Sequence, residues 1–172
     1  PIYLGDTVRN GDVLVIVESS DVGALKAEFL NALVGYEAKR EHLEILEEVK
    51  SAVMGRQIRE AKSALRTATN HLMNAEQALV NLGFEISAAE FAALGDEQRA
   101  AKIRTLGLSP AVLAGIDAAR VTSNLIPLRA PFDGVVIGRE VVIGENVAAG
   151  KQIFEIADVS RMWVVLSRSE EH

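Results

Sequence analysis

Residues 5–14 decide the fold, because they recur near the other end of the chain. The first copy reads Gly5-Asp6-Thr7-Val8-Arg9-Asn10-Gly11-Asp12-Val13-Leu14, and the second reads Gly144-Glu145-Asn146-Val147-Ala148-Ala149-Gly150-Lys151-Gln152-Ile153. Both follow the pattern Gly-x-x-Val-x-x-Gly-x-x-apolar, and an apolar stretch follows each. Glycines at this spacing suit tight turns that need a positive φ, and the valine between them can enter a core. The pair therefore predicts one small β-domain built from two similar halves.

The sequence between the copies has the period of long helices. Over residues 21–48 a 4–3 spacing selects seven positions, of which only Lys39 is polar: Leu25, Phe29, Ala32, Tyr36, Lys39, Leu43 and Leu46. Over residues 55–82 a strict 3–4 spacing selects Ile58, Ala61, Leu65, Ala68, Leu72, Ala75, Leu79 and Leu82. Such heptads are typical of a coiled coil, and each helix would be roughly 42 Å long. Residues 49–54 are short enough to reverse the chain, so we expect an antiparallel helical hairpin.

Shorter helices are expected after the hairpin. Ser87 followed by Glu90 has the pattern of a capping box, and Asp96 is placed to cap a helix over residues 97–106. Ser109, with a proline after it, has the pattern of a further helix start.

We expect this third short helix to reach about Ser123 and Pro127 to end the helical region. If the two copied halves form one domain, residues near 21 and 128 must be neighbours. The predicted class is α+β: a long antiparallel hairpin with extra short helices, inserted into a split β-sandwich. The expected division is a first half-domain at 1–20, the helical insert at 21–127, a second half-domain at 128–159 and the start of a following β-domain at 160–172. A chain cut in this way is expected to be part of a longer protein.

Composition argues against several classes of function. The formal charge of −6 does not suit a nucleic-acid-binding protein, and the absence of cysteine excludes disulfides and thiolate metal sites. No run of about 18 apolar residues, as a membrane span needs, is present. His42 and His71 are predicted to lie too far apart along the hairpin to share a metal ion, and the three methionines are scattered.

Catalytic patterns are missing as well. The sequence has no G-x-S-x-G or H-E-x-x-H motif. The glycines of the first copy precede Asp12, where a phosphate-binding loop has lysine. Glu44, Glu47 and Glu48 are interpreted as a hydrated helix face. We therefore predict no catalytic residue, no cofactor and no metal site, and a protein that is not an enzyme.

Two stretches make the expected β-sandwich resemble a lipoyl domain. Val17-Glu18-Ser19-Ser20-Asp21-Val22 and Ala130-Pro131-Phe132-Asp133-Gly134-Val135 are similar to the two sides of a biotinyl/lipoyl carrier domain. The position of that family's modified lysine is taken by Asp21. A carrier domain that lacks its lysine and is split by a coiled-coil hairpin resembles the periplasmic adaptor (membrane fusion protein) family of bacterial efflux pumps.

Within that family, three segments look most like the heavy-metal branch: residues 21–23, 106–109 and 154–164. The branch serves resistance–nodulation–division transporters that export copper and silver, or cobalt, zinc and cadmium. The resemblance implies a periplasmic subunit, attached to the inner membrane through a segment outside this chain, that bridges the transporter to an outer-membrane channel and self-associates into a ring. It places channel docking at the tip of the hairpin: Lys50, Ser51, Val53, Met54, Gly55 and Arg56.

Other functions remain open from the sequence. The chain is also compatible with an adaptor of a drug-efflux or protein-secretion pump, because substrate choice resides largely in the transporter. A carrier or interaction module of an enzyme complex is a further alternative. Lys26 and Lys151 are then the nearby candidates for the modified lysine.

Overall fold

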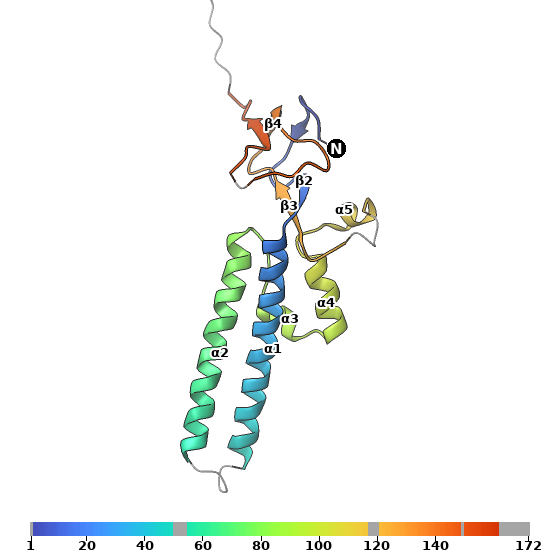
Figure 1. Cartoon of the computed structure of the whole chain (residues 1–172). Coiled ribbons are helices and arrows are strands. Elements are labelled where there is room, and N and C mark those ends of the chain that lie inside the picture. Colours follow the sequence, from blue (N-terminus) through green and yellow to red (C-terminus); the bar gives the residue numbers. More distant parts are fainter. Residues whose placement is uncertain (1, 50–54, 117–120, 149, 162–172) are drawn as a thin grey trace, which may run out of the picture. The chain divides into compact units, whose positions relative to one another are not determined.

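The computed structural model describes residues 2–49, 55–116, 121–148 and 150–161 and has the predicted mixed α+β class (Figure 1). Its elements follow one another as β1 (Thr7–Val8), β2 (Val13–Glu18), α1 (Ser20–Glu48), α2 (Gly55–Asn81), α3 (Ala88–Ala92), α4 (Asp96–Arg104), α5 (Pro110–Ala114), β3 (Leu125–Arg129), β4 (Gly134–Arg139) and β5 (Phe154–Ala157).

The chain divides into two compact units. The helical unit is Val17–Ile126, and the β-unit combines Pro1–Ile16 with Pro127–His172. Both crossings between the units fall within strands, one in β2 and one in β3, which pair with each other. The division into residues 1–20, 21–127, 128–159 and 160–172 stays a prediction, and residues 162–172 lie outside the described part of the chain.

The β-unit contains a three-stranded antiparallel sheet in the order β1–β4–β5. Val8 pairs with Gly134, and Val135 pairs with Ala157, while a register shift interrupts β4 between Val136 and Gly138. Its small core contains Val8, Ala130 and Val136, with Ile2, Leu14, Phe154 and Ile156 packed against them.

The two copied segments adopt matching turns, as their sequences predict. All four copied glycines have positive φ, at 89° and 87° in the first copy and 86° and 85° in the second. In the first copy the Tyr3 amide donates to Asp6 Oδ2 at 2.8 Å, and at the equivalent place the Val142 amide donates to Glu145 Oε2 at 3.1 Å. The repeat is therefore one of local hydrogen bonding as well as of sequence.

The helical unit contains the predicted hairpin, and its two long helices lie within a residue of the expected bounds. The 3–4 stripe of α2 is buried at Ile58, Ala61, Leu72, Ala75 and Leu79, as an apolar seam requires. In α1, Phe29 and Ala32 are buried, whereas Lys39 is exposed.

A second face of α1 is also buried, which the heptad pattern did not predict. Leu33 and Lys26 lie outside the 4–3 stripe, yet their side chains are 1% and 0% exposed. Figure 1 shows the reason: α1 lies between α2 and the pair α3–α4. Phe29 contacts Phe91 of α3 edge-to-face, with ring centroids 5.2 Å apart. An edge-to-face aromatic pair contributes about 0.5–1.5 kcal/mol beyond its buried area.

Arg99 attaches this second layer to α1. Its Nη1 and Nη2 donate to the two carboxylate oxygens of Glu37 at 2.8 and 2.7 Å. Its Nε donates to the Phe91 carbonyl at 2.9 Å, and Nη2 also donates to the Ala92 carbonyl at 3.0 Å. The hydrogen bonds to Glu37 raise the pKa of Arg99 above its ordinary value.

The helix-start predictions for α3 and α4 were only partly right. Ser87 does precede α3, but its side chain makes no capping hydrogen bond; the Ala88 amide donates to Glu76 Oε2 of α2 at 3.4 Å instead. A carboxylate from α2 thus accepts from the first amide of α3, whereas a capping serine would accept from the second or third. Asp96 is the first residue of α4 rather than its cap, because Gly95 takes the extended N-cap conformation.

The third short helix is shorter than predicted. Ser109 Oγ accepts from the Val112 amide at 3.4 Å, as a cap should, but α5 ends at Ala114 with Gly115 as the C-cap. A glycine inside a helix costs about 1 kcal/mol relative to alanine, which favours ending α5 before this residue. Pro127 lies inside β3 and does not end the helical region.

Candidate functional site

The hairpin tip was the predicted docking site. Helix α1 ends at Glu48 and α2 begins at Gly55. Four of the predicted tip residues, Lys50, Ser51, Val53 and Met54, lie outside the described part of the chain. The other two, Gly55 and Arg56, occupy the exposed first turn of α2, where Arg56 Nε donates to Glu60 Oε1 at 2.7 Å.

The acidic residues near the tip are exposed, as predicted for a hydrated face. Glu47 pairs across the hairpin with Lys62, with Oε1 and Nζ 2.9 Å apart, and Glu44 lies 3.6 Å from Arg40 on its own helix. Exposed pairs of this kind contribute about 0–1 kcal/mol each. They indicate a solvated surface rather than an acid–base pair.

The histidines do not come together. His71 Nε2 lies 2.7 Å from Glu28 Oε1, and both side chains are about half exposed (55% and 49%). His42 is exposed on the distal part of α1. Among the described residues, no group of three or more His, Asp or Glu side chains is arranged to hold a metal ion.

Lys26, an alternative candidate for a modified lysine, is buried. Its Nζ donates to the Leu125 carbonyl at 3.0 Å and lies 4.8 Å from the centroid of the Phe84 ring. Burial lowers the pKa of Lys26 from 10.5 to about 8. A side chain that is 0% exposed cannot enter another protein's active site, so this lysine serves the packing of the helical unit.

The other two positions of interest also lack the setting of a carrier lysine. Lys151 pairs with Glu145 within the second copied turn. Asp21, at the position of the carrier family's modified lysine, lies in the first turn of α1, where a carboxylate interacts favourably with the helix dipole. At this position the chain begins the long helix α1.

The insert leaves and returns at one place, as domain closure predicts. The Ser19 amide donates to the Asn124 carbonyl at 2.8 Å, and Ser19 Oγ accepts from the Val22 amide at 3.5 Å as the N-cap of α1. Gly23 lies against Asn124: a Cβ at this position would come 1.9 Å from Asn124 Oδ1. This contact gives a physical reason for glycine in the Asp21-Val22-Gly23 segment.

The Ala-Pro-x-x-Gly segment of the β-unit has an equally direct explanation. Ala130 is buried, and its amide donates to the Asp12 carbonyl at 2.9 Å. A Cβ at Gly134 would lie 2.5 Å from the Ala157 carbonyl oxygen and 2.7 Å from Ile156 Cγ2. The resemblance to carrier domains therefore rests on residues that pack the two copied halves together.

No helix among the described residues has the length and apolar character needed to cross a membrane. Sequence reasoning missed two structural features of the helical unit, the burial of Lys26 and the Arg99–Glu37 pair. The buried face that contains Lys26 has its own signal, because Val22, Lys26 and Leu33 follow helical spacing beside the predicted stripe and continue it around Phe29.

Comparison with known proteins finds a matching family model and several similar proteins. The family model "CzcB-like, barrel-sandwich hybrid domain" matches residues 2–158. The cobalt-zinc-cadmium resistance protein CzcB of Cupriavidus metallidurans is 24% identical over 167 residues, and the cation efflux system protein CzcB of Alcaligenes sp. is 23% identical over 167 residues. Each alignment covers 95% of this chain but only 26% of the relative, so the chain spans about a quarter of their length.

The crystal structure of ZneB from Cupriavidus metallidurans has a similar fold, with a TM-score of 0.55 and 20% sequence identity. The match covers 93% of this chain and 55% of the ZneB chain. The family model extends from the first strand region through the hairpin to the last described strand. The chain therefore belongs to the CzcB-like barrel-sandwich hybrid domain family, and so to the heavy-metal branch of the membrane fusion proteins that its sequence resembles.

Proposed function

We propose that this chain is the hairpin and lipoyl-like part of a periplasmic adaptor in a tripartite efflux system. The adaptor bridges an inner-membrane resistance–nodulation–division transporter to an outer-membrane channel and assembles into a ring. The cargo is a heavy-metal cation. In the proposed system the adaptor lies in the periplasm and is attached to the inner membrane through a segment outside this chain.

The family match over residues 2–158 is the observation that carries this proposal. It includes the copied turns, the glycine contacts and the helical insert in one continuous alignment. The names of the two CzcB relatives, one for cobalt, zinc and cadmium resistance and one for cation efflux, support a metal cargo. The buried Lys26 and the paired Lys151 give no support to a carrier module.

Growth inhibition of the native host tests the cargo. The gene is deleted, and growth is measured against copper, silver, zinc, cobalt and cadmium beside a panel of drugs and detergents. We expect selective sensitivity to one or two metals that the full-length gene reverses. Sensitivity to drugs alone would retain an adaptor but reject the metal cargo.

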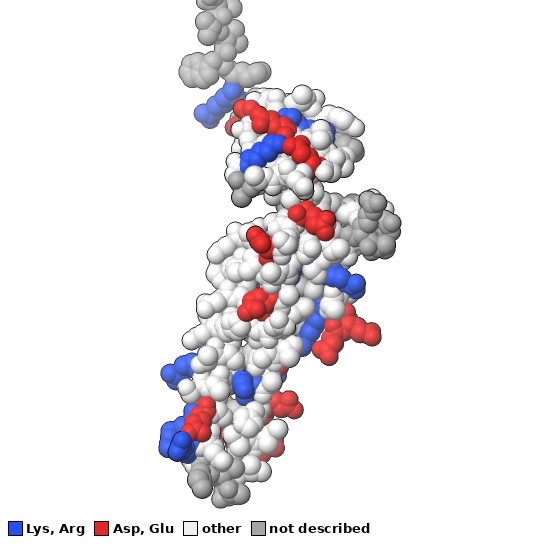
Figure 2. Space-filling model, in the orientation of Figure 1, with Lys and Arg blue, Asp and Glu red and all other residues white. Residues whose placement is uncertain are grey.

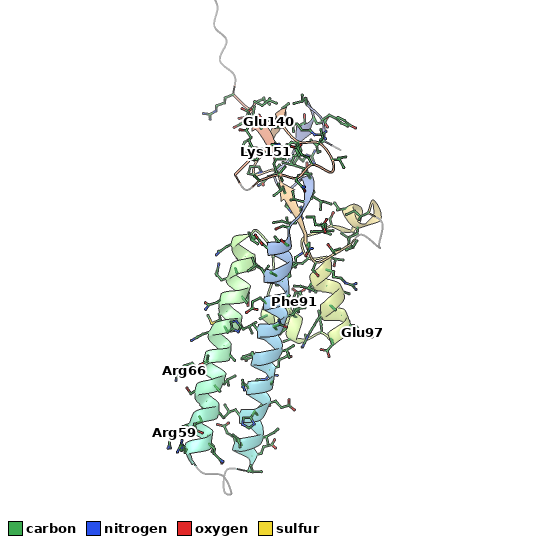
Figure 3. The ribbon with its side chains drawn as sticks, in the orientation of Figure 1. Arg59, Arg66, Phe91, Glu97, Glu140 and Lys151 are labelled. Atoms are coloured by element: carbon green, nitrogen blue, oxygen red, sulfur yellow. The ribbon has the colours of Figure 1, made fainter. Side chains whose placement is uncertain are left out.

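Site-specific cross-linking tests docking through the tip, with Lys50, Ser51, Val53, Met54, Gly55 and Arg56 as the proposed contact residues. Because the chain contains no cysteine, Met54→Cys introduces a unique thiol in this part of the full-length protein. We expect it to cross-link to the outer-membrane channel. Glu97→Cys, on α4, is the control that should label but not trap the channel (Figure 3). A Met54→Cys variant that labels freely without trapping the channel would reject tip docking.

A further inference from the structure

The two helices of the hairpin carry opposite charge over their distal halves. Residues 34–48 of α1 contain five glutamates against one lysine and one arginine. Residues 55–70 of α2 contain three arginines and one lysine against one glutamate. One helix is therefore acidic and the other basic over the same part of the hairpin. Figure 2 shows Lys and Arg side chains gathered over the distal part of α2.

Pairing within the chain uses only part of this charge. Among the described residues, four ion pairs engage charges of the distal halves: Lys62–Glu47, Arg40–Glu44, Arg56–Glu60 and the pair of Glu37 with Arg99 of α4. Glu41, Glu48, Arg59 and Arg66 are exposed, and no ion pair or hydrogen bond within the described residues engages their side chains. Figure 3 shows Arg59 and Arg66 on the edge of α2 that faces away from α1.

Helix geometry places the two glutamates on the opposite outer edge. Each residue turns an α-helix by about 100°, so positions two apart point in nearly opposite directions. Glu41 is two residues from Leu43, and Glu48 is two residues from Leu46, and both leucines belong to the half-buried stripe. The glutamates therefore lie on the side of α1 that faces away from α2.

The outer edges differ in shape and polarity as well as in charge. On α1, Val34 and Ile45 are 56% and 52% exposed and lie on the same edge as Glu41 and Glu48. We call this set, with Ala38, the acidic edge. The matching set on α2, which we call the basic edge, combines two arginines with two small polar side chains: Arg59, Ser63, Arg66 and Thr67. Exposed apolar side chains opposite small ones can pack closely across a helix–helix contact.

The spacing of the charges also matches. Glu41 and Glu48 are seven residues apart, as are Arg59 and Arg66, and seven residues rise roughly 10.5 Å along a helix. The two pairs across the hairpin, Lys62–Glu47 and His71–Glu28, lie on either side of the level position, so residues of α1 and α2 whose numbers sum to about 104 lie at equal height. When two hairpins lie side by side in the same orientation, Arg59 is therefore within about 5 Å in height of Glu48, and Arg66 within about 5 Å of Glu41, which long side chains can span.

We propose that the acidic edge of one copy of this chain docks on the basic edge of a second copy. The occupant is a second copy because both complementary surfaces belong to the same hairpin at the same height. Such a contact is head-to-tail, so it repeats around a closed ring and leaves no copy with an unused edge. The inference rests on the ring assembly of the proposed function and assigns its contact residues.

Charge reversal in the full-length protein tests this assignment. R59E/R66E and E41K/E48K should each weaken self-association by about tenfold or more, measured by sedimentation, because two attractive pairs become repulsive. The variant that combines all four substitutions should recover most of the wild-type association. The control is R104E, an exposed arginine on α4 outside both edges, which should leave association unchanged.

Disulfide trapping tests the same contact independently. One tagged copy carries Ala38→Cys and another carries Thr67→Cys, two edge positions at nearly equal height, so a disulfide between them can form only between molecules. We expect the mixed pair to cross-link and each single variant alone to do so much less. Ala38→Cys homodimers would indicate a symmetric α1–α1 contact and overturn the proposal.

The possible outcomes distinguish a failure of the edge contact from a failure of the proposed function. If the protein still assembles after charge reversal and forms no mixed disulfide, the edge contact is wrong but the proposed ring stands. A full-length protein that stays monomeric at every concentration overturns both. Unchanged self-association with lost binding of the outer-membrane channel would assign the edges to the channel and overturn the second copy as occupant.

Discussion

Lys26 makes the stability of the helical unit depend on pH in a direction that can be calculated. Its ammonium is buried, with the Leu125 carbonyl as its hydrogen-bond acceptor and the Phe84 ring beneath it. Desolvation lowers its pKa from 10.5 to about 8. Between these two values the unfolded chain binds the proton more strongly than the folded chain, so the free energy of unfolding rises with pH.

The magnitude follows from the two pKa values. At neutral pH the desolvated charge costs about 3 kcal/mol, because a pKa difference of 1 between the folded and unfolded chains corresponds to about 1.4 kcal/mol. From about pH 7 to about pH 9.5, roughly 2 kcal/mol of this cost is relieved as the amine loses its proton. Lys26→Met keeps the aliphatic stem but removes the titrating group. The free energy of unfolding of this variant therefore lacks the pH-dependent contribution of the ammonium.

Urea unfolding followed by circular dichroism at several pH values measures the effect. We expect the wild type to gain about 2 kcal/mol relative to Lys26→Met over that range. Other titrating groups cancel in this difference. Lys39→Met, which removes an exposed lysine from the same helix, is the matched control for the substitution. If the Lys26→Met difference does not change with pH, the buried ammonium does not titrate as argued.

Three further predictions concern packing and backbone strain, and urea unfolding measures each. Gly134→Val should destabilise the chain by roughly 2–3 kcal/mol, because its Cβ would meet the Ala157 carbonyl at 2.5 Å, whereas Gly35→Ala, into open space inside α1, should not destabilise it. Arg99→Met should lower the free energy of unfolding by about 2–3 kcal/mol, because Glu37 and two backbone carbonyls lose their hydrogen-bond donor. It should also raise the rate of amide hydrogen exchange in α3 and α4. Unchanged exchange would reject Arg99 as the residue that attaches these helices to α1. Gly5→Ala and Gly144→Ala should each cost about 1–2 kcal/mol through φ strain alone, and clearly unequal costs would contradict the equivalence of the two copied turns.

The features that the sequence predicted well are those in which one physical constraint dominates. A positive φ selects glycine almost alone, so the four copied glycines identified their turns. A continuous apolar seam selects a 3–4 period, so α2 was placed to within a residue. The return of the insert to its starting point follows from the split domain, and the Ser19–Asn124 hydrogen bond meets that requirement.

The features it missed depend on which groups compete for one partner. Ser87 has the right type and spacing for a cap, yet the first amide of α3 donates to Glu76 from α2 and the serine side chain makes no capping hydrogen bond. Asp96 is displaced by one residue because Gly95 adopts the N-cap conformation. The position of Glu76 depends on the packing of α2 and is not visible in the local pattern, whereas Gly95 stands next to Asp96 in the sequence.

A single heptad pattern also does not reveal that a helix packs on two sides. Helix α1 carries its α2-facing stripe and a second row that faces α3 and α4, and Lys26 belongs to the second row. On its outer side α1 also carries exposed apolar side chains, Val34 before Glu37 and Ile45 after it. An outer edge that stays partly apolar where no layer of its own chain covers it is the sequence signal for a further partner. The same reasoning that explains the buried lysine therefore leads to the acidic edge as a contact surface.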